Sequence, residues 1–317
     1  MSFLERALEL AERGRGTTAP NPVVGAVLVR DGEVVGEGWH ERPGGLHAEV
    51  VALEAAGGRA RGATLYVTLE PCAHHGRTRP CVDAVVSAGV ACVVAAVGDP
   101  DPRTNGQGFE RLREAGIEVE LAGGELEWRA RVQNEGFRTW AALGRPFVTY
   151  KAAATLDGRV TVPGARWVTG EESRRRVHEL RAASDVVAVG LGTVRADAPR
   201  LDARGVDAAR QPRRLAFGRG PLPEGSELEL RSGALEDELR ALACEGVQTL
   251  LLEGGPTLAT AFLRVGLVDK LTLFVAPTLS GRGARFLGEL EAPLALLHPT
   301  TERLGEDVLL AGYLRVP

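Results

Sequence analysis

The spacing of apolar residues in the first half of the chain alternates between that of helices and that of strands. In residues 3–13 and 47–57 the apolar positions recur every three or four residues, which predicts two helices. Residues 23–39, VVGAVLVRDGEVVGEGW, form two apolar runs joined by Asp31-Gly32, a dipeptide that favours a hairpin turn. The chain is therefore expected to open with a helix, a β-hairpin and a second helix.

Strand and helix patterns then alternate up to residue 121. Apolar runs predict strands at 64–70, 91–99 and 117–121, and helical spacing predicts helices at 79–89 and 109–116. Strands separated by helices pair mostly in parallel, so the first half is expected to form a layered α/β domain.

A second α/β pattern begins after Gly144-Arg145-Pro146, which separates a helical stretch from a new strand. We place the domain boundary there, which gives two domains of residues 1–144 and 145–317. In the second domain we expect a helix at 171–183 and strands within 147–154, 185–192, 247–255 and 271–279.

Composition narrows the class of protein. A chain of 317 residues can bury two cores, and 44% hydrophobic with 25% charged residues is typical of soluble globular proteins. No apolar run reaches the roughly 20 residues of a membrane span, so no membrane partner is expected. Four cysteines and no signal-like N-terminus favour a cytoplasmic location. A net charge of −4 without a basic stretch argues against a nucleic-acid partner.

Three separated residues have the chemistry of a catalytic zinc site. His47 opens a predicted helix, Cys72 follows a predicted strand in LEPC, and Cys81 begins another predicted helix. One imidazole and two thiolates leave the fourth position of zinc open for water, whose pKa zinc lowers towards ~7. Glu49 lies two residues after His47, where it can reach the water without binding the metal and act as general acid and base. This is the zinc deaminase signature.

These cysteines allow two other interpretations. A Cys72–Cys81 disulfide is disfavoured in a reducing compartment. A structural zinc would need a fourth ligand, which His74 or His75 could supply, but it would leave Glu49 without a role.

The eight residues between the cysteines, AHHGRTRP, identify a family. With His47-Ala48-Glu49, Thr68-Leu69-Glu70-Pro71-Cys72 and NPVVGAVLV at 21–29, the chain resembles the bifunctional deaminase–reductases of riboflavin biosynthesis. The resemblance implies a cytidine-deaminase-like three-layer α/β/α domain, followed by a dihydrofolate-reductase-like α/β domain. It also implies that Asn21 and the loop between the cysteines line a pocket for a phosphorylated ribosylaminopyrimidine.

Loop residues supply donors suited to the ribose phosphate of such a substrate. His74, His75 and Arg77 can all donate to an anion. His74 matches the family motif and is favoured as a substrate contact, whereas His75 and Arg77 could equally be solvated loop charges.

The second domain has no G-x-G-x-x-G fingerprint, but segments at 145–160, 167–170 and 189–201 resemble the family's reductase half, which uses NADPH. Glu253-Gly254-Gly255-Pro256 joins a strand to a helix whose free N–H groups suit a phosphate. By the resemblance, the residues at the NADPH site are Ala153, Trp167, Thr193, Asp197, Gly255, Pro256, Thr257, Leu258, Ala259, Thr260 and Ala261. Those at the substrate site are Ala165, Arg181, Leu201, Arg204 and Glu253.

Lys151 is a further candidate for the substrate site. It is one of two lysines beside 36 arginines, which suggests that a compact ammonium is needed there, although a strand-edge charge is the simpler alternative. Trp167 could instead be a core aromatic, and Asp197 a cap.

The expected function is two consecutive steps of riboflavin synthesis, with one zinc ion and NADPH as cofactors. The first deaminates diaminohydroxyphosphoribosylaminopyrimidine, and the second reduces the ribosyl group of 5-amino-6-(5-phosphoribosylamino)uracil to ribityl. A homo-oligomer is expected. The alternatives are a deaminase with an altered second half, a nucleic-acid base deaminase, and a structural zinc protein that binds a nucleotide.

Overall fold

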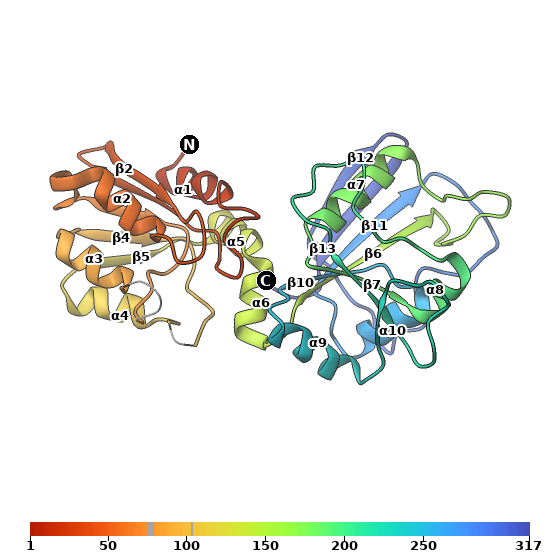
Figure 1. The fold of residues 1–317 in the computed structure, drawn as a ribbon. Helices are drawn as coiled ribbons and strands as arrows, with labels where there is room; N and C mark the ends of the chain where they lie inside the picture. The colour runs from red at the N-terminus through yellow and green to blue at the C-terminus, as the bar shows by residue number, and fades with distance from the viewer. Residues whose placement is uncertain (75–78, 103) are drawn as a thin grey trace. The chain divides into compact units, whose positions relative to one another are not determined.

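The structure, a computed structural model, describes residues 1–74, 79–102 and 104–317. It divides into two compact units, Met1–Leu143 and Gly144–Pro317 (Figure 1). Each unit has its own sheet and its own buried apolar core, so each is described by itself. In the described part of the chain, no helix is both long and apolar enough to cross a membrane.

The first unit is built on a five-stranded sheet in the order β2-β1-β3-β4-β5. Strand β1 is antiparallel to both β2 and β3, whereas β3, β4 and β5 are parallel. The strands are β1 (Gly25–Arg30), β2 (Glu33–Trp39), β3 (Thr64–Val67), β4 (Cys92–Ala95) and β5 (Glu118–Leu121). The helices are α1 (Phe3–Glu12), α2 (Ala48–Ala56), the short η1 (Gly57–Ala60), α3 (Cys81–Ala88), α4 (Gln107–Glu114), α5 (Gly124–Gln133) and α6 (Glu135–Leu143).

Helices α1 and α2 cover opposite faces of this sheet, and glycines let both come close. A Cβ added to Gly25 would lie 2.0 Å from the carbonyl oxygen of Ala7 in α1. One added to Gly38 would lie 2.4 Å from the carbonyl oxygen of Ala48 in α2. Gly38 pairs with Ala26, the neighbour of Gly25, so the two glycines face opposite sides of the sheet. This close packing fixes the start of α2, where His47 and Glu49 lie.

The second unit is built on an eight-stranded sheet in the order β12-β13-β11-β6-β10-β7-β8-β9. Strands β11, β6, β10, β7, β8 and β9 are parallel, and β13 is antiparallel to β11 and β12. The strands are β6 (Phe147–Thr155), β7 (Val186–Gly190), β8 (Arg213–Phe217), β9 (Glu229–Arg231), β10 (Thr249–Leu252), β11 (Lys270–Ala276), β12 (Leu297–Leu304) and β13 (Asp307–Tyr313). The helices are α7 (Glu171–Ala182), α8 (Leu191–Asp197), α9 (Leu235–Cys244) and α10 (Pro256–Arg264).

The α/β prediction is confirmed for both halves, and the strands and helices expected from apolar spacing are present. Several strands end earlier than expected. β3 ends at Val67 and β10 at Leu252, and the polar ends of these predicted runs become loops at the carboxyl edge of each sheet. The antiparallel pair β12 and β13 was not predicted. Nearly all of β12 is exposed, so it lacks the apolar alternation that identifies a half-buried strand.

A buried ion pair between Arg145 and Asp269 lies next to the first residues of β6 in the second unit. Asp269, which is fully buried, accepts hydrogen bonds from both terminal nitrogens of Arg145, each at 2.7 Å, and from the backbone N–H of Val148 at 2.8 Å. The side chain of Arg145 is only 9% exposed. These bonds tie the first residues of β6 to the loop before β11.

Replacing Asp269 by alanine is expected to lower the free energy of unfolding of the second unit by about 3–5 kcal/mol, because Arg145 keeps a buried charge without its partner. Amide hydrogen exchange of peptides from β6 and β11 at increasing urea measures the loss. The exposed pair Arg240–Asp237 supplies the control, since Asp237→Ala is expected to change stability by less than about 0.5 kcal/mol. Equal effects of the two changes would contradict this account.

Candidate active sites

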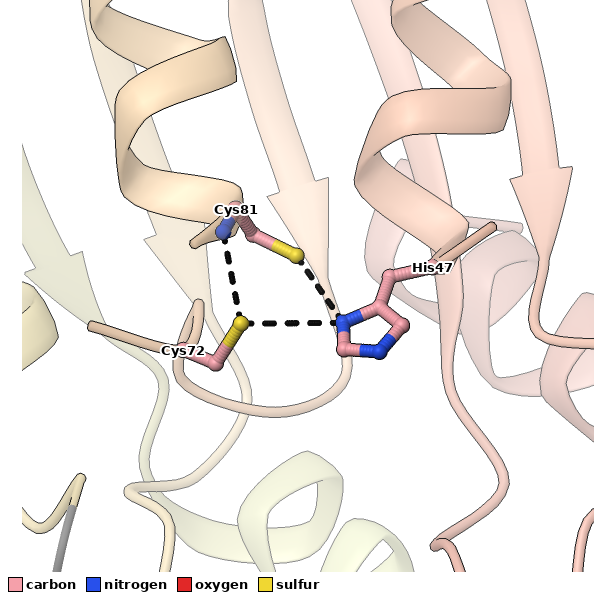
Figure 2. A group of neighbouring side chains, drawn as sticks. All are labelled: His47, Cys72 and Cys81. Carbon is pink, nitrogen blue, oxygen red and sulfur yellow. Dashed lines mark hydrogen bonds between the residues drawn. The ribbon is translucent and has the colours of Figure 1, made fainter. Parts of the chain in front are cut away.

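Three side chains from separate segments meet in the first unit (Figure 2). The His47 Nδ1 atom lies 3.1 Å from the sulfur of Cys81 and 3.6 Å from the sulfur of Cys72. The backbone N–H of Cys81 points at the Cys72 sulfur, 3.3 Å away. The structure therefore brings together the three residues that the sequence proposed as zinc ligands.

Local structure explains how these side chains reach one point. His47 is the N-cap of α2, and Cys81 is the first residue of α3. Cys72 lies in the loop after β3, and its backbone oxygen accepts a hydrogen bond from the N–H of Val82. Helix N-termini carry partial positive charge, which favours thiolates at these positions.

The residues fit a zinc ion. Zinc bonds of about 2.0 Å to nitrogen and 2.3 Å to sulfur place neighbouring donor atoms about 3.5 Å apart. The donor atoms here all lie within 4.8 Å of one another. The Cys81 thiol and the His47 imidazole lower the pKa of the Cys72 thiol to about 4, whereas the adjacent Cys72 sulfur and burial raise the pKa of Cys81. The lowered pKa favours the thiolate form of Cys72, which is the form that binds a metal.

Glu49 lies beside this cluster and is only 3% exposed. Burial and the charge of Cys72 together raise the pKa of Glu49 to about 7. A carboxyl group with a pKa near neutrality can both accept and return a proton, as a general acid and base must.

Glu49 and two of the three donors line a cavity of about 360 Å³ in the first unit. Of the predicted substrate residues, Asn21 and His74 line it as well. His74 Nδ1 lies 3.0 Å from the hydroxyl of Thr104. Arg77 and His75 lie outside the described residues.

Sequence reasoning assigned no function to His40, which also lines this cavity. Its Nδ1 lies 3.0 Å from the carbonyl oxygen of Leu46, so Nδ1 must carry the proton, and Nε2 accepts from the amide of Asn21 at 3.0 Å. His40 therefore orients Asn21, a role that no sequence spacing signals. Asp99 was missed too; it lines the cavity, and burial raises its pKa to about 6.

The second unit contains a buried cluster of one carboxylate and two cations. Glu253, whose side chain is 7% exposed, accepts from Lys151 Nζ at 3.1 Å and from Arg181 Nε at 2.6 Å. Leu252 pairs with Tyr150 in the parallel sheet, so the next residues, Glu253 and Lys151, lie at the same level. Arg181 reaches them from α7. Lys151 is thus a half-buried partner of Glu253 rather than a strand-edge charge.

This cluster lines a cavity of about 1290 Å³ at the carboxyl ends of β6, β7 and β10. Ligands of open α/β sheets bind at such an edge. The predicted residues that line it are Lys151, Ala153, Trp167, Arg181, Thr193, Asp197, Arg204, Glu253, Gly255 and Pro256. Ala165, Leu201, Thr257, Leu258, Ala259, Thr260 and Ala261 lie outside this lining.

Several of the residues outside the lining contact other parts of the protein instead. Leu201 and Ala259 are buried within apolar clusters, and the Thr260 hydroxyl accepts from the N–H of Gly288.

Trp167, which lines the cavity, is 52% exposed and is not a core aromatic. The guanidinium groups of Arg166 and Arg174 lie over its ring, 5.1 and 5.5 Å from the ring centre. Pro256 is the first residue of α10, as the sequence predicted, and with Gly255 it lines the cavity.

Comparisons with known proteins match the two halves of the chain to two family models. Residues 1–97 match the family model of the cytidine and deoxycytidylate deaminase zinc-binding region, and residues 146–310 match that of the RibD C-terminal domain. The riboflavin biosynthesis protein RibD of Aquifex aeolicus is 40% identical, with 98% of this chain and 97% of that protein covered. The Escherichia coli RibD is 40% identical, with 90% of this chain and 89% of that protein covered.

Solved structures show the same architecture. Acinetobacter baumannii RibD superposes with a TM-score of 0.83 at 38% identity, over 98% of this chain and 97% of that one. A Thermotoga maritima diaminohydroxyphosphoribosylaminopyrimidine deaminase/5-amino-6-(5-phosphoribosylamino)uracil reductase superposes with a TM-score of 0.82 at 35% identity, with the same coverage.

A zinc-binding deaminase region followed by a reductase domain defines a bifunctional deaminase–reductase enzyme. The chain belongs to the family of the riboflavin biosynthesis protein RibD. Zinc and NADPH, the cofactors expected from the sequence, agree with this membership. A nucleic-acid base deaminase and a purely structural zinc protein are thereby excluded.

The charge state of Glu253 predicts a pH dependence of stability. Burial alone would favour the neutral acid, but Lys151 and Arg181 outweigh it and lower the pKa of Glu253 from 4.5 to about 2. A carboxylate whose pKa is lowered on folding stabilises the fold above its unfolded pKa, and this contribution is lost as pH falls towards the folded pKa. We therefore expect the urea midpoints of wild type and Glu253→Gln to differ by a constant amount from pH 7 to about 5 and to converge below about 4.5. Convergence at higher pH would contradict the assignment.

Proposed function

We propose that residues 1–144 carry the deaminase and residues 145–317 the reductase of two consecutive steps. The first converts diaminohydroxyphosphoribosylaminopyrimidine to 5-amino-6-(5-phosphoribosylamino)uracil with release of ammonia. The second reduces the ribosyl group of that product to ribityl. The observation that carries the proposal is that His47, Cys72 and Cys81 meet beside a cavity that Glu49 also lines. The second unit of the chain has its own cavity at the carboxyl edge of a parallel sheet.

In the deaminase site, His47, Cys72 and Cys81 would hold zinc. Zinc bound there lowers the pKa of a water molecule towards ~7 and makes it a nucleophile at neutral pH. Glu49 would serve as the proton carrier: it would accept a proton from the water that adds to the amino-bearing ring carbon and return it to the departing amine. Asn21, fixed by His40, and His74, bonded to Thr104, orient the substrate in the same cavity.

In the reductase site the protein mainly binds and aligns two ligands. NADPH supplies the hydride when bound. Ala153, Trp167, Thr193, Asp197 and the start of α10 would hold the cofactor, because they share one cavity. Lys151, Arg181, Arg204 and Glu253 would hold the phosphorylated substrate, since Arg181 and Arg204 offer guanidinium groups suited to a phosphate. Ala165 and Leu201 remain predictions from the family resemblance.

We further expect a homo-oligomer that acts on small molecules in the cytoplasm. The free thiols of Cys72 and Cys81 support a reducing compartment, because oxidation would remove both sulfur donors.

Replacing Glu49 by glutamine is expected to lower the kcat for ammonia release by about 10²–10⁴-fold, because the proton carrier is lost. Zinc content and reductase turnover of 5-amino-6-(5-phosphoribosylamino)uracil are expected to stay unchanged. Glu54→Gln, an exposed carboxylate on the same helix, is the matched control. Full ammonia release by Glu49→Gln with zinc in place would refute the mechanism.

Removal of zinc tests the independence of the two sites. A chelator is expected to abolish ammonia release and leave NADPH oxidation with the aminouracil substrate intact, because the donors lie only in the first unit. A coupled assay that follows ammonia and NADPH absorbance measures both. The assignment of the second unit would fail if the zinc-loaded protein oxidised no NADPH with this substrate.

A further inference from the structure

Among the described residues, the side chain of Glu70 accepts four hydrogen bonds that no catalytic step requires. It lies in the loop after β3, two residues before Cys72, and is only 3% exposed. Its Oε2 accepts from the backbone N–H of Asp99 at 3.2 Å and of Gly106 at 3.0 Å. Its Oε1 accepts from the N–H of Gly108 at 2.9 Å and of Phe109 at 3.3 Å.

These bonds cap the N-terminus of helix α4, although Glu70 is distant from this helix in the sequence. The first N–H groups of a helix lack partners within the helix, and a side chain at the N-cap usually satisfies one of them. The N-cap of α4 is Gly106, which has no side chain, and its backbone is left-handed at φ +84°. Glu70 takes the place of that side chain, and its negative charge also suits the positive end of the helix.

The same carboxylate binds the backbone at two separate positions. It accepts from the N–H of Asp99 and from the N–H of Gly106. Gly108 adds a steric lock, because a Cβ there would lie 2.1 Å from the carbonyl oxygen of Pro71. The start of α4 therefore packs closely against the loop that carries Cys72.

Residues close to these two positions supply part of the wall of the deaminase cavity. Asp99 and Asp101 line the cavity, and the buried Thr104 bonds to His74 Nδ1 through its hydroxyl. Glu70 is therefore connected to the substrate side of the cavity through these residues.

Cys72, in contrast, is held without the Glu70 carboxylate. Its backbone oxygen accepts from Val82, and its sulfur faces the N–H of Cys81. The backbone N–H of Glu70 itself bonds to Val97 and would survive a side-chain substitution.

We propose that Glu70 is a positioning residue for the deaminase: it fixes the backbone at Asp99 and at the start of α4, so that Asp99 and His74 face the substrate. The inference rests on the proposed deaminase function and adds a determinant of substrate affinity. It assigns Glu70 to the KM for the pyrimidine and not to zinc retention or proton transfer.

Glu70→Gln is the decisive variant, because it keeps the shape but turns an NH₂ group towards two backbone N–H donors. We expect the KM of ammonia release to rise about tenfold or more, with kcat within about threefold, as for a group that contributes to binding in the ground state. Zinc content and reductase turnover should equal those of wild type. The control is Glu110→Gln, an exposed carboxylate in the first turn of the same helix, which should leave KM unchanged.

Thr104→Val tests the next link with little risk to folding, because it removes only the hydroxyl that bonds His74. It should also raise KM with zinc retained. If Glu70 acts through these residues, the double variant Glu70→Gln/Thr104→Val should raise KM by less than the product of the single effects.

The proposal is overturned if Glu70→Gln changes KM no more than Glu110→Gln, if it loses zinc, or if the two effects multiply. An unchanged KM in Thr104→Val would overturn it as well. These outcomes differ from failure of the proposed function, in which the wild-type, zinc-loaded protein itself releases no ammonia from the pyrimidine.

Discussion

A charge removed from water must be matched by opposite charge or by hydrogen bonds, and this constraint shapes both cavities. Four buried carboxylates meet it in different ways. Asp269 has two guanidinium groups, Glu253 has two cations, and Glu70 has four backbone N–H groups. Glu49 has the least compensation, so burial wins and its pKa rises to about 7. The group left partly unmatched is the one that can exchange a proton near neutral pH.

The comparison of Glu49 with Glu253 shows that burial alone does not set a role. Both side chains are nearly inaccessible, yet the pKa of Glu253 falls to about 2, because Lys151 and Arg181 contact it directly. Glu253 therefore stays ionised and holds two cations in place. Its chemistry is that of an anchor, whereas the chemistry of Glu49 is that of a proton carrier.

Much of the deaminase site could be predicted because its residues lie in short motifs. The H-A-E motif carries His47 and Glu49, and the P-C motif carries Cys72. The spacing from Cys72 to Cys81 identifies the family. His40 and Asp99 could not be found in this way, because their roles depend on contacts with Asn21 and Glu70 that are distant in sequence. In the reductase half, only some of the residues that the family resemblance implied line the cavity. Lys151 and Glu253 share the cavity, whereas Leu201 and Ala259 are buried among apolar side chains.

The sequence by itself determined the alternation of strands and helices, a candidate donor set for zinc and the family. These follow from local spacing and from residue chemistry, which do not depend on the path of the chain elsewhere. Only the tertiary structure decided which carboxylate is a proton carrier, which is an anchor and which is a helix cap. That decision depends on the partners that β6, α7 and the residues before α4 bring to each carboxylate, and hence on electrostatic environments created by distant segments.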